Sequence, residues 1–259
     1  MGRLDGKTAI ITGATGGIGG ATAAKFLEEG ANLVLAGRDE GRLQAAADKL
    51  GGGDRVAICA GQPAEQADVE RLVATAVDRF GALDIFVANA GSEGKVMPIL
   101  MTSVENFEEV QQANLRGTFL AIKHAALAMQ ANGQESGGSI VAVSSVAGEV
   151  GVAGIGAYAA SKHGILGLVK VAALELAAMN IRVNAVAPAP IDNAMMQSIE
   201  GQASPDDPSL ARAQFNSLIA MGRYGRNEEV ANLIAFLSSD EASYCTGSNY
   251  AVDGGFLAA

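Results

Sequence analysis

The stretch that decides the fold is Thr12–Gly19, which reads TGATGGIG near the start of the chain. A short apolar run precedes it, and a segment with helical periodicity follows it. Glycines here permit a tight turn, a close approach of pyrophosphate to the backbone, and close packing of helix on strand, which we assign in turn to Gly13, Gly17 and Gly19. The N–H groups and the dipole at a helix N-terminus also favour phosphate. The stretch predicts a dinucleotide-binding strand–turn–helix unit, with an ordinary glycine-rich turn as the alternative.

Along the rest of the chain, apolar runs rich in β-branched residues alternate with longer segments of helical periodicity. This alternation predicts a doubly wound, Rossmann-like α/β fold, in which helices flank a seven-stranded parallel sheet. The connections are short, so we expect residues 1–259 to form a single domain. The predicted strands are Thr8–Thr12, Leu33–Ala36, Val56–Cys59, Ile85–Ala88, Ile140–Val143, Arg182–Ala187 and Asn249–Val252. The predicted helices span 17–29, 39–50, 65–80, 104–131, 157–179 and 228–238.

One long segment, residues 189–226, interrupts the alternation. It contains Pro190 and the polar stretch Ser204–Pro208, and it is too long for an ordinary loop between a strand and a helix. It follows the C-terminal end of a predicted strand, where open α/β sheets bind ligands. We therefore predict a short substrate lid of one or two helices, with a disordered surface insertion as the alternative.

Composition excludes several classes of protein. The chain is 49% hydrophobic and 18% charged, which excludes intrinsic disorder. Its net charge of −10 argues against nucleic acid and anionic membrane surfaces as partners. No apolar run reaches about 18 residues, no targeting segment is visible, and the two cysteines, Cys59 and Cys245, make no disulfide framework. We expect a cytoplasmic protein without a metal site.

The end of the second predicted strand identifies the position that selects the cofactor. About 20 residues past the glycines, an aspartate would bind a ribose 2′-hydroxyl and repel a 2′-phosphate. This chain has Gly37-Arg38 instead, which leaves room and offers a guanidinium to phosphate oxygens. We predict a preference for NADP(H), with NAD(H) possible. The alternatives are that Arg38 stacks on adenine or faces solvent.

Three residues predict acid–base chemistry. Tyr158 and Lys162 lie four residues apart in a predicted helix, so their side chains share one face. An ammonium about 5 Å away, at an effective dielectric constant of about 20, would lower the tyrosine pKa by about two units. Tyr158 would then serve as a general acid and base. Ser145, just beyond a predicted strand, is placed to hydrogen-bond a carbonyl or alcohol oxygen.

Together with further motifs, these residues resemble the classical short-chain dehydrogenases/reductases over nearly the full chain. The resemblance implies a nicotinamide cofactor, hydride transfer at a carbonyl or secondary alcohol, and a homotetramer. The matching motifs are Thr12–Gly19, Asn89-Ala90-Gly91, Asn114 in Asn114–Gly117, Ser145, Tyr158 with Lys162, Arg182-Val183-Asn184 before Pro188, and Val252–Gly255.

The resemblance also implies a role for each site residue. Ser145 would orient the substrate oxygen, Tyr158 would transfer the proton, Lys162 would hold the ribose and lower the tyrosine pKa, and Asn114 would position a water. The backbone near Ile191 would meet the nicotinamide carboxamide. The residues implied to contact the cofactor are Gly13, Thr15, Gly17, Ile18, Gly19, Arg38, Gln62, Asn89, Gly91, Tyr158, Lys162, Pro188, Ile191 and Asn193.

Three positions depart from the family pattern. Gln62 stands where an aspartate usually meets the adenine amino group, although its amide oxygen can still accept that hydrogen bond. Ala189 replaces the usual glycine after Pro188, and its methyl group narrows the nicotinamide end. Asn193 replaces a frequent threonine, which puts the carboxamide contact there in question.

The expected substrate pocket has little positive charge. No lysine or arginine occurs between Lys123 and Lys162 or between Arg182 and Arg212, and the predicted lid carries several acidic residues. The residues expected to line the pocket are Ser145, Val146, Glu149, Val152, Tyr158, Met195 and Met196. Glu149 is either a polar selector or a solvated loop residue, and the two methionines either line the pocket or pack within the lid.

Two stretches, Asn89–Lys95 and the lid from Asp207 to Gly225, resemble levodione reductase-like dehydrogenases of cyclic alcohols and ketones. We therefore expect hydride transfer between NADP(H) and an uncharged, cyclic ketone or secondary alcohol. A 3-oxoacyl-thioester reductase or a hydroxysteroid dehydrogenase is the alternative enzyme. A catalytically silent sensor of the nicotinamide cofactor is the alternative of another class.

Overall fold

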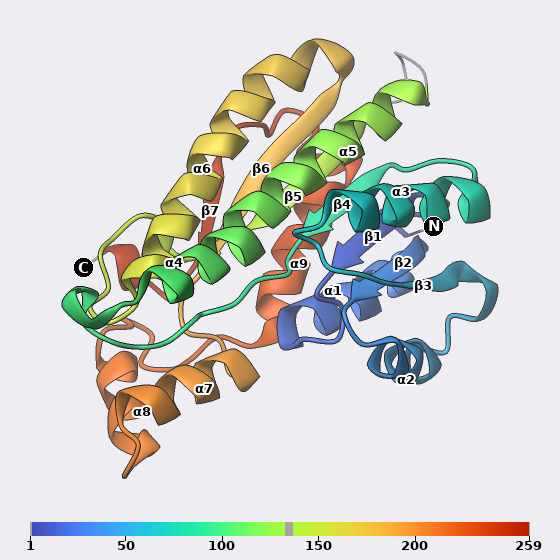
Figure 1. The fold of residues 1–259 in the computed structure, drawn as a ribbon. Helices are drawn as coiled ribbons and strands as arrows, with labels where there is room; N and C mark the ends of the chain where they lie inside the picture. Colours follow the sequence, from blue (N-terminus) through green and yellow to red (C-terminus); the bar gives the residue numbers. More distant parts are fainter. Residues whose placement is uncertain (1, 133–136, 259) are drawn as a thin grey trace.

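The computed structural model describes residues 2–132 and 137–258 and confirms the doubly wound α/β fold (Figure 1). One parallel sheet has the strand order β3-β2-β1-β4-β5-β6-β7. Its strands are β1 (Thr8–Thr12), β2 (Asn32–Gly37), β3 (Val56–Ala60), β4 (Ile85–Ala88), β5 (Gly138–Val143), β6 (Ile181–Pro188) and β7 (Asn249–Val252). The predicted bounds of β1, β4 and β7 are confirmed, and each of the other strands is longer than predicted by one to two residues.

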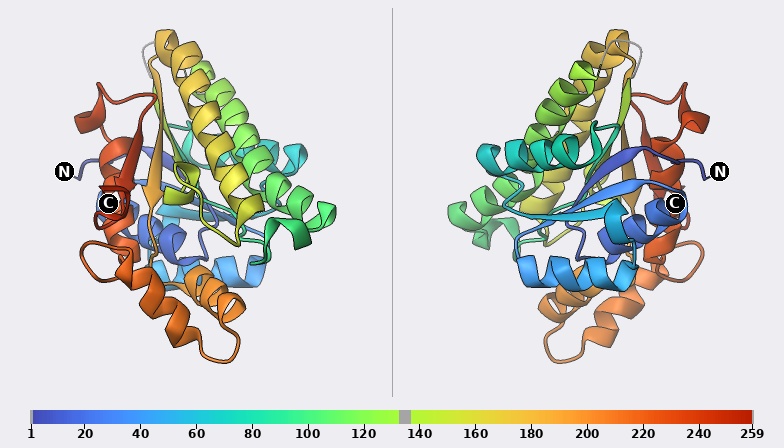
Figure 2. Two further views of the ribbon diagram at one scale, coloured as in Figure 1. Left: turned by 90° about the vertical axis from the view of Figure 1, so that its left-hand side faces the viewer. Right: turned by 90° about the vertical axis from the view of Figure 1, so that its right-hand side faces the viewer.

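Helices cover both faces of the sheet (Figure 2). They are α1 (Gly17–Glu28), α2 (Glu40–Leu50), α3 (Gln66–Phe80), α4 (Val104–Val110), α5 (Gly117–Ala131), α6 (Gly156–Leu176), α7 (Ala194–Ala203), α8 (Pro208–Ser217) and α9 (Asn227–Ser238). Within the described part of the chain, no helix combines the length and the hydropathy that a membrane span needs.

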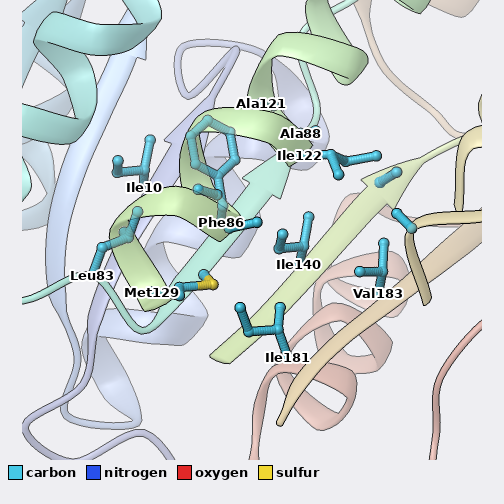
Figure 3. Packing of buried hydrophobic residues seen from close by; sticks show 14 of the residues in the cluster. Ile10, Leu83, Phe86, Ala88, Ala121, Ile122, Met129, Ile140, Ile181 and Val183 are labelled. Atoms are coloured by element: carbon cyan, nitrogen blue, oxygen red, sulfur yellow. The ribbon is translucent and has the colours of Figure 1, made fainter. Parts of the chain in front are cut away.

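The strand register builds two hydrophobic layers. Ile10, Phe86, Ile140 and Val183 lie side by side across four strands, and α3, α5 and α6 pack on this row (Figure 3). On the opposite face, the row that includes Ile11 packs against α1, α2 and α9. Burying each such side chain stabilises the fold by roughly 1.5–3 kcal/mol. Apolar residues stand on both faces of these strands because both faces of the sheet are covered.

The predicted helix 104–131 is three elements rather than one. A wider π-helical turn, Gln111–Arg116, separates α4 from α5. Apolar spacing does not reveal one extra residue in a turn, so the sequence could not predict this break. Such turns occur frequently at functional sites, and this one carries Asn114.

The segment 189–226 contains two short helices, α7 and α8, as predicted. Asn193 caps α7 through its side-chain oxygen, and Asp207 caps α8 with Pro208 in the first turn. The two helices project beyond the ends of the strands (Figure 2). The lid therefore stands over the edge where the strand order reverses between β1 and β4, which is the ligand-binding edge of this fold.

Candidate active site

A cavity of about 800 Å³ opens at the carboxyl ends of β1 and β4, beneath the lid. Its volume lies within the usual range for small-molecule sites. Every residue predicted to contact the cofactor lines it: Gly13, Thr15, Gly17, Ile18, Gly19, Arg38, Gln62, Asn89, Gly91, Tyr158, Lys162, Pro188, Ile191 and Asn193. The structure thus brings the predicted cofactor contacts together in one place.

The glycine turn between β1 and α1 is held in shape by Asn89. Gly13 has a φ of +66°, a conformation that favours glycine. The Asn89 side-chain amide donates to the carbonyl oxygens of Thr12 (2.9 Å) and Gly13 (3.3 Å). Asn89 is therefore a support of the turn as well as part of the cavity wall. This leaves the N-terminus of α1 facing the cavity, where it suits a phosphate.

Gly17 and Gly19 each leave room for different neighbouring atoms. A β-carbon on Gly19 would collide with the carbonyl oxygen of Gly13, which agrees with the predicted close packing of helix on strand. A β-carbon on Gly17 would collide with Asn227 and lie 2.8 Å from the Asn193 β-carbon. Gly17 is predicted to let pyrophosphate approach the backbone. In the structure it also leaves room for Asn193 and Asn227.

Substituting Gly19 with alanine tests this tight turn. We expect the change to lower the free energy of unfolding by about 1–3 kcal/mol, the usual effect of overpacking, and to weaken NADPH binding. Gly20→Ala is the matched control, because its β-carbon would lie 3.5 Å from the Ala14 carbonyl oxygen, an ordinary contact. Urea unfolding and cofactor titration measure both effects. Equal stability of the two variants would contradict the prediction.

Two arginines, Arg38 and Arg42, line one end of the cavity. Arg38 is exposed at the end of β2, and Arg42 lies one turn into α2. The sequence reading missed Arg42, because Arg38 precedes the helix and helical spacing does not relate the two side chains. Among the residues that the structure describes, neither guanidinium forms an ion pair within the protein. Both charges are therefore available to a bound phosphate.

The backbone of Gln62 is used within the loop after β3. Its backbone N–H donates to the Asp68 carboxylate (2.7 Å), and this hydrogen bond, with Arg71, holds the pKa of Asp68 below its usual value. The Gln62 side chain is exposed beside the cavity. Gln62 thus lines the same cavity as Arg38 and Arg42.

Ser145, Tyr158 and Lys162 meet at the centre of the cavity. Ser145 follows β5, and Tyr158 and Lys162 lie on one face of α6, both buried. Ser145 lies beside Tyr158, and its hydroxyl acts to lower the tyrosine pKa. The Ser145 hydroxyl donates to the Pro188 carbonyl oxygen (3.5 Å) and accepts from the Ala147 N–H (3.1 Å). The Lys162 ammonium donates to the Val143 carbonyl oxygen (2.7 Å) and lies 5.4 Å from the centre of the Tyr158 ring. The spacing thus places the two side chains together as expected.

The predicted lowering of the tyrosine pKa is wrong for this structure. Burial raises the pKa of Tyr158 to about 12, with a smaller raising effect of the Glu93 carboxylate, while the Ser145 hydrogen bond opposes it. Burial lowers the pKa of Lys162 to about 8. The sequence argument used distance alone and left out the desolvation of both groups. Tyr158 is consequently a protonated donor at neutral pH.

Asn114 lies behind the cavity wall rather than in it. Its side chain is fully buried, accepts a hydrogen bond from the Ser92 backbone N–H (2.8 Å), and donates to the Ser92 carbonyl (2.9 Å) and the Ser161 hydroxyl (2.9 Å). A β-carbon on Gly91 would lie 3.0 Å from the Asn114 side-chain oxygen. The oxygen and the nitrogen of the Asn114 side chain thus both form hydrogen bonds within the protein.

The segment that enters the predicted lid, residues 188–191, lines another part of the cavity. The Gly225 N–H donates to the Pro190 carbonyl (3.0 Å), and the Asp192 N–H donates to the Gly225 carbonyl (2.9 Å). Because peptide groups alternate in direction along an extended chain, the peptide groups of Ile191 point the other way. The Asn193 amide is used within the protein, capping α7 and donating to Asn227 (3.2 Å).

The substrate side of the cavity is mostly apolar. Six of the seven expected residues line it: Ser145, Val146, Val152, Tyr158, Met195 and Met196. Glu149 is the exception, because its carboxylate is exposed and accepts a hydrogen bond from Asn249 on β7. Glu93 and Phe256 are among the lining residues that the sequence reading missed. Phe256 lies near the C-terminus, which the hydrogen bond from Met221 N–H to the Gly254 carbonyl (3.0 Å) ties to the end of the lid.

Glu93 provides a test of the charge around Tyr158. A negative charge disfavours tyrosinate, so Glu93→Gln should lower the Tyr158 pKa. The pH profile of alcohol oxidation, which needs tyrosinate, should move to lower pH by up to about one unit. Glu149→Gln is the control, because that carboxylate lies outside the cavity. An unchanged profile in Glu93→Gln, or the same shift in both variants, would contradict this expectation.

Comparison with known proteins agrees with this geometry. A family model described as enoyl-(acyl carrier protein) reductase matches residues 13–257. The chain is 36% identical to cyclohexanol dehydrogenase of Acinetobacter sp. (strain SE19), covering 98% of this chain and 96% of that protein. It is 37% identical to a 3-oxoacyl-[acyl-carrier-protein] reductase of Thermotoga maritima, covering 98% and 99%.

A solved structure supports the same assignment. The crystal structure of levodione reductase superposes with a TM-score of 0.95 at 35% identity, covering 99% of this chain and 100% of that one. Sequence and fold thus agree over the whole length, and the cavity holds the serine, tyrosine and lysine that the resemblance requires. The chain belongs to the short-chain dehydrogenase/reductase family of oxidoreductases.

Proposed function

We propose that the protein transfers a hydride between NADP(H) and an uncharged cyclic ketone or secondary alcohol. The observation that carries this proposal is that the neighbouring Ser145 and Tyr158 hydroxyls line one apolar cavity, with Lys162 beside them. A hydroxyl pair of this kind suits a carbonyl oxygen, because both groups can donate to it.

Each residue has a defined part in ketone reduction. Ser145 donates a hydrogen bond that orients the carbonyl oxygen, and Tyr158 donates the proton that this oxygen takes up. The raised pKa of Tyr158, about 12, keeps that proton on the hydroxyl at neutral pH, which favours the reductive direction. Lys162 supplies positive charge beside the ring, and Asn114 fixes Ser92 behind it. The bound nicotinamide cofactor supplies or accepts the hydride.

Two positive charges at one end of the cavity support the preference for NADP(H). Arg38 and Arg42 stand at one end of the cavity without ion-pair partners among the described residues. Two guanidinium groups suit a 2′-phosphate, and no carboxylate lines that end of the cavity. NAD(H) with an arginine stacked on adenine is the alternative.

The side chains that line the cavity support the proposed substrate class. Val146, Val152, Met195 and Met196 form an apolar surface, and Phe256 closes the side near the C-terminus. The lid is acidic: Asp192 and Glu200 take the Arg212 guanidinium as their partner (3.1 and 3.9 Å). A phosphorylated or carrier-bound substrate would find little free positive charge there. The names of cyclohexanol dehydrogenase and levodione reductase support a cyclic substrate.

Steady-state assays test the substrate class. With NADPH, we expect cyclohexanone to be reduced with a higher kcat/KM than acetoacetyl-CoA, a model 3-oxoacyl thioester. The reverse order would favour the acyl-thioester reductase, which the Thermotoga maritima relative represents. A hydroxysteroid as the best substrate would favour the steroid alternative. Cofactor binding without turnover of any carbonyl would indicate a sensor.

We further propose that residues 1–259 form one domain and assemble as a homotetramer in the cytoplasm. Exposed apolar side chains on α5 and α6, which lie side by side (Figures 1 and 2), support a helical interface: Phe119 (48%), Leu127 (56%), Val171 (55%) and Leu174 (83%). The unpaired edge of β7 supports a second interface. Light scattering tests the mass, and a monomer would contradict the assembly.

A further inference from the structure

A hydrogen-bonded loop connects the buried site to the lid. We call residues 92–97, which follow β4, the bridging loop. At one end, Ser92 is bound by the Asn114 side chain through two hydrogen bonds (2.8 and 2.9 Å). At the other end, the Met97 N–H donates to the Gly154 carbonyl (2.8 Å), and Met97 pairs with Ile155 just before α6. Both ends are thus fixed to elements that carry the site.

Two further hydrogen bonds fix the middle of the bridging loop. The Lys95 N–H donates to the side-chain oxygen of Asn106 (3.1 Å), and the Gly94 N–H donates to the Ser92 hydroxyl (3.2 Å). Gly94 has a φ of +68°, and a β-carbon there would press on Val110. This conformation leaves the Gly94 carbonyl and the Val96 N–H free to meet the lid.

Gln202, in the last turn of α7, takes both of these groups. Its side-chain oxygen accepts from the Val96 N–H (3.0 Å), and its side-chain nitrogen donates to the Gly94 carbonyl (3.4 Å) and the Ser198 hydroxyl (3.2 Å). The two sides of this contact line the cavity, with Glu93 and Val96 on the loop and with Ile199 and Ala203 on α7. The hydrogen bonds therefore span the cavity wall.

We propose that Gln202 is a positioning residue for the reaction, which rests on the function proposed above. It binds α7 to the bridging loop, closes the substrate side of the cavity, and holds the loop that carries Glu93 near Tyr158. Gln202 is exposed, so its side chain is not part of the core. A primary amide also accepts and donates at once, which suits the neighbouring N–H and carbonyl of the loop.

Substrate kinetics give the first test, with a matched control on the same helix. Gln197 is exposed on α7, and its side chain has no hydrogen bond among the described residues. We expect Gln202→Ala to raise the KM for cyclohexanone about fivefold, the loss of roughly one net hydrogen bond. The Kd for NADPH and the Tm should stay at wild-type values, and Gln197→Ala should resemble wild type. An unchanged KM in Gln202→Ala, or equal changes in both variants, would overturn the proposal.

Hydrogen exchange gives a test that needs no substrate. The Val96 amide should exchange at least about tenfold faster in Gln202→Ala than in wild type, because its acceptor is gone. Gln202→Glu keeps an acceptor for Val96 and should keep that amide protected. Unchanged exchange in Gln202→Ala would overturn the proposal. If no cyclic ketone is turned over by wild type, the proposed function fails, and the exchange result still decides whether Gln202 binds the loop.

Discussion

Replacing Tyr158 by phenylalanine is expected to reduce ketone turnover by about 10²–10⁴-fold, the usual contribution of general acid–base catalysis. The change removes one oxygen from a side chain that is 8% exposed and keeps the ring that packs against Val110, Ala147 and Ile155. The hydroxyl beside Ser145, which donates the proton, is lost. The substrate oxygen then has no proton donor at that place, although the cavity keeps its shape.

Two measurements separate chemistry from binding in Tyr158→Phe. Titration with NADPH, followed by nicotinamide fluorescence, should give a Kd within about twofold of wild type, since a change of that size is well below the 1.4 kcal/mol of a tenfold effect. Tyr244→Phe is the control, because that ring is fully exposed. Full activity of Tyr158→Phe would exclude Tyr158 as the acid.

Replacing both Arg38 and Arg42 by alanine is expected to weaken NADPH binding at least tenfold, or about 1.4 kcal/mol. Arginine and phosphate form charge-assisted hydrogen bonds, which are about twice as strong as neutral ones. NADH carries no 2′-phosphate, so its Kd should change less than about twofold on the same scale. Each single substitution should give part of the loss, because both guanidinium groups reach the same end of the cavity.

Parallel fluorescence titrations of wild type and variant with both cofactors measure this effect. Arg79→Ala with Arg116→Ala is the control, because it changes the net charge equally on surfaces that do not line the cavity. A wild-type protein that binds NADH as tightly as NADPH would make Arg38 a stacking or surface residue. An oxidative role on an alcohol would then be the better assignment.

The sequence predicted the fold well because its signals are local and repeated. Thr8–Thr12 and Ile85–Ala88 are mostly apolar and are buried at every position, and the helices between strands have clear periodicity. The glycine turn also fixes which end of the sheet binds a ligand. The π-helical turn at Gln111–Arg116 escaped prediction, because an extra residue in one turn leaves the apolar pattern almost unchanged.

The sequence predicted those site residues whose relative position follows from their spacing along the chain. It missed those whose position depends on tertiary contacts. Tyr158 and Lys162 are brought together by one helix, and spacing suffices for that. Glu93 and Glu149 show the opposite case: the structure places Glu93 in the cavity and pairs Glu149 with Asn249 on the distant strand β7. The predicted direction of the tyrosine pKa shift was wrong for the same reason, because burial depends on the packing of the whole site.

Isotope transfer tests hydride transfer itself. NADPH deuterated at the reactive C4 position is incubated with cyclohexanone and the wild-type protein in ordinary water, and the alcohol is examined by mass spectrometry. We predict one deuterium on the carbinol carbon of the product, with the hydroxyl proton taken from water, and at least about 100-fold less product in the same time from Tyr158→Phe. A cyclohexanol product without deuterium, or no product from wild type with any cyclic ketone, would contradict hydride transfer to this substrate class.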